Sequence, residues 1–185
     1  NEVDGFYFET FALSENGSEI FSMNEASGMI KENGCSYFIA ESANANLTNG
    51  NVHLENAGLF FNPGATAIFA ENMTMESGDN QFSLEDLYFD QIMGENSATT
   101  TLNGDNTSMT MGDNIFNAEH MEINLFQSED PDNPGHMEML VQGVNFSNND
   151  TSFSAEEASL QMLSQTDGSS SIVLASSDVD LSLAH

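Results

Sequence analysis

The sequence predicts an all-β fold in which residues 1–185 form a single elongated antiparallel meander of about eleven bent strands, with a solenoid-like repeat. Three observations predict this fold. A short apolar template recurs from one end of the chain to the other. The connections between its copies alternate between short and long, and the short ones carry residues typical of tight hairpin turns.

The template has eight positions: apolar, any residue, an anchor, any, any, apolar, any, apolar. Alternation at a period of two is that of a strand with one buried face. The three-residue step in the middle shifts the phase by one, so each strand must bend or bulge there to keep its apolar side inward. The eleven copies lie at 6–13, 21–30, 38–45, 52–61, 68–75, 82–89, 102–109, 116–123, 139–146, 153–160 and 174–181.

Four of these copies have an alanine anchor followed directly by glutamate, at 40–41, 70–71, 118–119 and 155–156. A small residue lets the inside of a bend close up, whereas a carboxylate is suited to its solvent side. We therefore expect the Ala-Glu pairs to mark the bends, with alanine inside and glutamate outside.

The anchors follow one another at spacings of 15, 17, 14, 16, 14, 20, 14, 23, 14 and 21 residues. An antiparallel meander explains this two-beat rhythm, because its tight turns gather on one edge and its longer loops on the other. The tight turns contain Asn, Gly and Asp near 49–51, 78–80, 112–114 and 148–150. The template resumes after the longest loop, residues 128–135, so we expect no domain boundary there.

Charge limits the partners of this chain. It has 30 acidic residues and a single basic residue, Lys31, which gives a net charge of −29. Such a surface does not bind nucleic acid or anionic membranes. Its self-repulsion must be screened, which favours a salt-rich periplasmic or extracellular location after export. We find no long apolar run and no secretory leader, so we expect a mature chain that does not insert into a membrane.

No enzyme signature is present: no phosphate-binding glycine loop, no nucleophile elbow and no metal-spaced Cys or His pair. We therefore predict a non-enzymatic protein with no cofactor. Calcium is the ion that the sequence favours, because Asp130, Asp132 and Asn133 supply oxygen ligands in the longest loop. The alternative is an acidic loop that is simply solvated.

Eleven methionines allow two interpretations that the sequence does not separate, and copper binding by thioether groups is a third that is less favoured because the methionines are spread along the chain. They could fill an irregular core, or they could form an adaptable lining for acyl chains in a groove that the bent sheet leaves open. The residues predicted to line such a groove are Phe38, Leu47, Phe69, Met73, Met75, Phe89, Met121 and Leu125.

The rhythm of apolar strand, Ala-Glu, second apolar half-strand and Asn-Gly or Gly-Asp resembles the periplasmic lipopolysaccharide-transport proteins of the LptA/LptC type, the OstA-like family. The segments FIAESANANLTNGNVHLENAGLFF, AIFAENMTMESGDNQFSLEDLYF and NIFNAEHMEINLF carry this resemblance, and the opening GFYFETFALSENGSEIFSMNEASGMI is similar to the start of an LptC-type domain. The resemblance implies a β-jellyroll with a groove for the acyl chains of lipid A. It also implies head-to-tail pairing of edge strands into a bridge across the periplasm.

Two functions follow as hypotheses. The first is transport of a lipopolysaccharide-like glycolipid in the groove, with copies assembled head to tail. The second is an acidic extracellular subunit that polymerises into a filament by edge-strand pairing, in a calcium-dependent manner. Both use the same predicted assembly residues at the two ends of the meander: Phe6, Phe8, Phe11, Leu13, Leu174, Val179 and Leu181.

Overall fold

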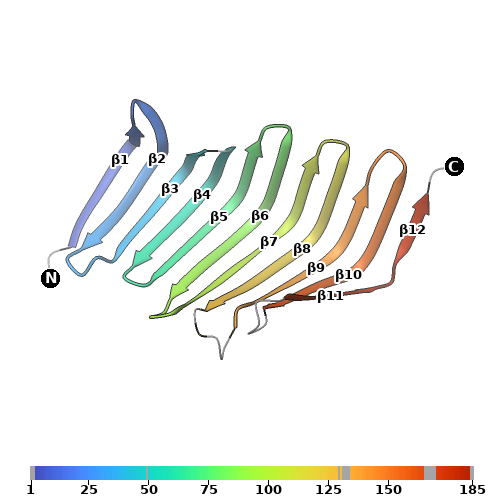
Figure 1. Ribbon diagram of the computed structural model, residues 1–185. Helices are drawn as coiled ribbons and strands as arrows, with labels where there is room; N and C mark the ends of the chain where they lie inside the picture. The colour runs from blue at the N-terminus through green and yellow to red at the C-terminus, as the bar shows by residue number, and fades with distance from the viewer. Residues whose placement is uncertain (1–2, 49, 129, 131–133, 165–169, 184–185) are drawn as a thin grey trace.

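A computed structural model describes residues 3–48, 50–128, 130, 134–164 and 170–183. These residues form one antiparallel sheet of twelve strands, arranged in chain order from β1 to β11 with β12 beside β10 (Figure 1). The predicted all-β meander is confirmed. The strands are β1 (Val3–Glu15), β2 (Ser18–Lys31), β3 (Ser36–Leu47), β4 (Gly50–Asn62), β5 (Ala65–Ser77), β6 (Asn80–Met93), β7 (Ser97–Met111), β8 (Asn114–Ser128), β9 (His136–Ser147), β10 (Thr151–Ser164), β11 (Ser170–Ser177) and β12 (Asp180–Leu183).

The last copy of the template accounts for the difference between eleven and twelve strands. β11 pairs with the second half of β10 and β12 with the first half, so the two together form one bent strand. Asp178 lies between them with a left-handed φ of 48°. The final strand is therefore divided at its bend, where the other template copies remain continuous.

The template also defines the register of the sheet. Its inward positions pair with inward positions of the next strand throughout, as in the row Phe38, Leu59, Ile68 and Phe89. The hydrophobic core is built from these positions, and Leu84 is 1% exposed. Because the template leaves the same gap in every strand, neighbouring strands align their bends and the sheet folds lengthwise along one continuous corner.

Small side chains occupy the inside of this corner. Ala26, Ala40 and Ala57 are completely buried, and Ala40 of β3 pairs directly with Ala57 of β4. The glutamates that follow the alanine anchors, such as Glu41, are exposed on the outside. The placement that we expected for the Ala-Glu pairs is therefore confirmed.

The bend itself is made in two ways. The backbone takes a left-handed φ at the corner in five strands from β2 to β9, none of which has the Ala-Glu pair, at Glu25, Asn56, Asp86, Asn106 and Gly143. None of the four Ala-Glu corners has such a residue. Asn and Asp tolerate this conformation better than most side chains do. Each Ala-Glu strand therefore lies beside a strand that supplies the left-handed residue.

The corner divides every full-length strand into two arms. In Figure 1 the upper arm ends in the tight turns between β1 and β2, β3 and β4, β5 and β6, β7 and β8, and β9 and β10. The lower arm ends in the remaining connections, which include the longest ones, although Pro63 and Gly64 alone join β4 to β5. The alternation of short and long spacings in the sequence thus corresponds to the two edges of the sheet.

Candidate functional site

The predicted groove residues lie in two different environments on the inward face. Met121 is 6% exposed and belongs to the packed corner, so its side chain fills the core. Phe38, Met73 and Phe89 are partly buried against that core, and Leu125 is also partly buried. Leu47 and Met75 lie near the ends of their strands and are exposed. Packing is therefore closed at the corner and opens toward the tips of the arms.

Large apolar side chains lie at the tips of both arms, along the two borders of the open side of the folded sheet. These residues occupy inward positions at or near the strand ends, and each has between 36% and 57% of its surface exposed. We call them the mouth residues: Leu13, Ile30, Leu47, Phe61, Met75, Met93 and Met111. The folded sheet shields its apolar face near the corner but leaves these two borders in contact with water.

The prediction that Phe69 lines the groove is wrong. Ile68 and Ala70 take the inward positions of β5, so the residue between them points to the opposite face. There the Phe69 ring packs against the rings of Phe60 and Tyr88, with centroid distances of 5.7 Å and 5.1 Å. Phe69 belongs to an aromatic row on the outer face that the template, which describes inward positions alone, did not reveal.

The predicted assembly residues lie on the two ends of the sheet. Among the described residues, β1 has a neighbouring strand on one side alone, and β11 and β12 pair with β10 alone. Phe6 and Phe11 are partly buried, whereas Phe8 and Leu13 are exposed. At the other end Leu174 is 74% exposed, and Val179 and Leu181 are also exposed. Both ends thus combine unpaired backbone with apolar side chains.

The predicted calcium ligands are not brought together in the part of the chain that can be examined. Asp130 is exposed, and its backbone N–H donates to the Ser128 hydroxyl at 3.0 Å. Asp132 and Asn133 lie outside the described residues. Within the described ranges, no group of three or more His, Cys, Asp or Glu side chains is arranged to hold a metal ion.

The outside of the corner carries a ladder of carboxylates and amides. Asn56 on β4 donates to Glu71 on β5 at 2.5 Å, and Asn72 on β5 donates back to Glu55 on β4 at 2.9 Å. Asn106 makes the same kind of bond to Glu85 at 2.6 Å. These bonds tie neighbouring strands together where the backbone pairing is interrupted. In the sequence, the signal for these cross-strand hydrogen bonds is the repeated Glu-Asn pair, at 55–56 and 71–72.

Two corner contacts bring acidic groups into hydrogen bonds. The phenol of Tyr7 donates to the Glu25 carboxylate, and this bond raises the pKa of Tyr7. At the other end of the sheet, a hydrogen bond with Asp178 raises the pKa of Glu156, and the negative charge of Asp178 adds to the effect. Where a proton is shared between these two carboxyl groups, it links β10 to the bend between β11 and β12.

We predict that this proton makes the last strand sensitive to pH. Because the folded pKa of Glu156 is raised, the contact is fully present below the ordinary carboxylate pKa and is lost as the pH rises through the folded value. Glu156→Gln replaces the proton with a permanent N–H donor. Hydrogen-exchange protection of β11 and β12 at pH 7 should therefore increase in this variant. The control Glu41→Gln should leave it unchanged, and equal protection in wild type and Glu156→Gln would contradict the prediction.

Comparison with protein-family models, with curated proteins and with solved structures finds no match to this chain. Its described residues include no helix of the length and apolarity that a membrane span requires.

Proposed function

We propose that the chain is a non-enzymatic protein that holds the acyl chains of a lipid or glycolipid along the open side of its folded sheet. The mouth residues are the observation that carries this proposal. Seven large apolar side chains, contributed by strands from β1 to β7, line the borders of one continuous apolar face. An apolar ligand that covers these side chains removes their surface from water, and this lowers the free energy of the complex.

The total surface of the chain supports the same proposal. It exposes 11,626 Å² to solvent, whereas a compact monomer of 20.0 kDa is expected to expose roughly 8,700 Å². A single folded sheet has no second layer to cover its arms. The excess surface is available for a ligand or for a neighbouring molecule.

The charge favours a lipid whose head group remains in water. The net charge of −29 repels an anionic head group from the protein surface unless salt or divalent cations screen it. Zwitterionic lipids and glycolipids with cation-bridged phosphates fit this requirement. A lipopolysaccharide-like ligand, suggested by the family resemblance, belongs to the second group.

The test is native mass spectrometry of the purified protein, followed by titration with a zwitterionic lysophospholipid and with lipid A. We expect a bound lipid mass, and we expect Met111→Asp to weaken binding by roughly tenfold or more, because it places a charge among the acyl chains. Met111 is 47% exposed, so the substitution leaves the core intact.

The matched control for this test is Ile115→Asp. Ile115 is 42% exposed and lies on the outer face, one residue before the inward Phe116. The control should bind lipid like the wild type. Absence of any bound lipid, or an equal loss in both variants, would overturn the assignment of the mouth residues.

A second function, assembly through the end strands into a filament or bridge, is favoured by the unpaired edges of β1 and of β11 with β12. The eleven successive strand positions impose a geometric condition on such assembly. Because strands alternate in direction, β1 and the last strand point the same way. When the copies keep their inward faces on the same side, head-to-tail junctions therefore require parallel pairing, whereas head-to-head or tail-to-tail junctions are antiparallel.

A further inference from the structure

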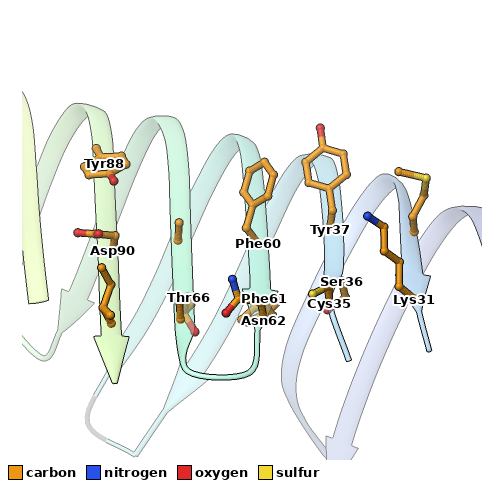
Figure 2. Close-up of a pocket in the computed structure, with 14 residues that line it drawn as sticks. Lys31, Cys35, Ser36, Tyr37, Phe60, Phe61, Asn62, Thr66, Tyr88 and Asp90 are labelled. Carbon is orange, nitrogen blue, oxygen red and sulfur yellow. The ribbon is translucent and has the colours of Figure 1, made fainter. Parts of the chain in front are cut away.

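The outer face of the lower arm contains a cleft outside the proposed lipid site, with which it shares one lining residue, Phe61. It spans β2 to β6 and has a volume of about 490 Å³, and most of its lining residues take outward positions on their strands. Figure 2 shows Tyr37, Phe60 and Tyr88 projecting from this face. A volume of this size lies within the range of small-molecule binding sites, roughly 300–1,000 Å³.

A continuous row of aromatic rings runs along the cleft, with Tyr37, Phe60 and Tyr88 in its lining and Phe69 beside it. The ring centroids of Tyr37 and Phe60 are 4.5 Å apart, and Phe69 connects Phe60 to Tyr88 on the next strands. Ala67 on β5 forms the floor of the cleft, because it pairs with the larger Phe60 on one side and with the larger Asp90 on the other. A small side chain between large neighbours leaves the hollow.

The fold does not require these rings. The same cross-strand rows continue from β6 onto β7 and β8, where Tyr88 is followed by Asn103 and Glu122. The sheet therefore forms equally well with polar side chains at the equivalent outward positions. Phe60 and Phe69 nevertheless remain 41% and 42% exposed to water. Exposed aromatic groups that the fold does not need indicate a binding surface.

Polar groups of both charges stand around the rings. Lys31, the single basic residue of the chain, lines the cleft from β2, and Asp90 lines it from β6. Asn62 adds an amide that both donates and accepts hydrogen bonds. Within the described residues, the Lys31 side chain takes part in no ion pair. The cleft thus offers apolar rings together with free donors and acceptors.

We propose that this outer cleft binds a neutral saccharide. A pyranose ring has a face of C–H bonds that stacks on aromatic rings and an edge of hydroxyl groups that bonds to carboxylate, amide and ammonium groups. An acyl chain would leave Asp90 and Asn62 unsatisfied. An anionic polymer would meet a net charge of −29 with one lysine to oppose it. A neutral sugar chain avoids both costs and can extend across the strands along the ring row.

The chain provides its own reporters for this site. It has no tryptophan and three tyrosines, two of which, Tyr37 and Tyr88, line the cleft. Its single cysteine, Cys35, lies at the same site. Stacking of a sugar should therefore change tyrosine emission and slow alkylation of Cys35.

The experiment titrates the full chain with cellohexaose, laminarihexaose, maltohexaose and mannohexaose, and with dextran sulfate as the anionic comparison. We expect at least one neutral hexaose to change tyrosine emission and to protect Cys35, and dextran sulfate to do neither. Phe60→Ser should weaken binding by about tenfold or more, since it removes the central ring of the row, and Phe60→Tyr should retain it.

The matched control is Phe126→Ser. Phe126 is an outer-face aromatic on β8 that stacks on His136, away from the cleft. Binding should persist in this variant. The proposal is overturned if no neutral hexaose binds, or if Phe60→Ser binds as the wild type does. It is also overturned if Phe60→Ser instead abolishes self-association in sedimentation, which would make the cleft an interface between copies. Lipid binding at the mouth residues is measured separately, so either result stands without the other.

Discussion

Replacement of Leu84 by alanine is expected to lower the free energy of unfolding by about 2–5 kcal/mol, the range for a buried leucine whose cavity does not collapse. Leu84 is 1% exposed and is a template anchor of β6, paired with Met73 on β5. Thermal and denaturant unfolding would measure the loss. Leu163→Ala is the control, because Leu163 is 44% exposed on β10 and its truncation creates no cavity.

Gly104 on β7 provides the space that the Leu84 side chain occupies. A Cβ placed on this glycine would lie 2.7 Å from Cδ1 of Leu84 and 3.0 Å from the Glu85 carbonyl oxygen. Leu84 therefore fills space that only glycine leaves open. Gly104→Ala alone should also destabilise the protein, by about 1–3 kcal/mol.

The double variant Leu84→Ala with Gly104→Ala should lose less stability than the sum of the two single losses, because the added methyl group partly fills the cavity. Purely additive losses would contradict this account of the contact. A stability of Leu84→Ala equal to that of Leu163→Ala would contradict the assignment of Leu84 to the core.

The inward face of this molecule was predictable residue by residue. Phe38, Ala40, Ala43 and Ala45 of one template copy pair with inward positions of the next, as the palindromic spacing of the template requires. Each copy pairs with its neighbour in the same way, so one pattern determines the inward residues of all eleven copies. Alternation at a period of two, with one shift of phase at the bend, is sufficient to assign them.

Other features depend on contacts between strands that one template copy does not describe. The left-handed corner residue is present on some strands and absent from others: Asn56 of β4 has it, whereas Glu41 of the neighbouring β3 does not. The outer rings of Tyr37 and Phe60 meet only once β3 and β4 are in register. The prediction for Phe69 is wrong because its hydrophobicity suggests an inward position, whereas the alternation of β5 places Ile68 and Ala70 inward and Phe69 outward.

Self-association through the end strands is expected to depend strongly on calcium. We expect the protein to form concentration-dependent oligomers in the presence of calcium, and we expect chelation to reverse them, because two copies at −29 each repel unless cations screen or bridge them. Sedimentation velocity over a range of concentrations measures this. A strict monomer with calcium at the highest concentration would refute it.

Apolar contacts at the last strand should contribute directly to the junction. The double variant Leu174→Ser and Leu181→Ser removes two inward side chains that are 74% and 63% exposed, and it should weaken association by roughly tenfold or more. The control Val173→Ser changes the neighbouring outward residue of β11. It should associate as the wild type does.

Mixing two variants distinguishes the possible junctions. Phe8→Ser weakens the β1 edge, and Leu174→Ser with Leu181→Ser weakens the opposite edge. In head-to-tail assembly every junction uses one edge of each kind, so each variant alone is monomeric and their mixture forms dimers through the intact edges. In two-fold assembly each variant still dimerises through its own intact edge, and mixing changes nothing. Because β1 and the last strand point the same way, antiparallel pairing that keeps the inward faces on the same side is available only to the two-fold junction, and that is the result we expect.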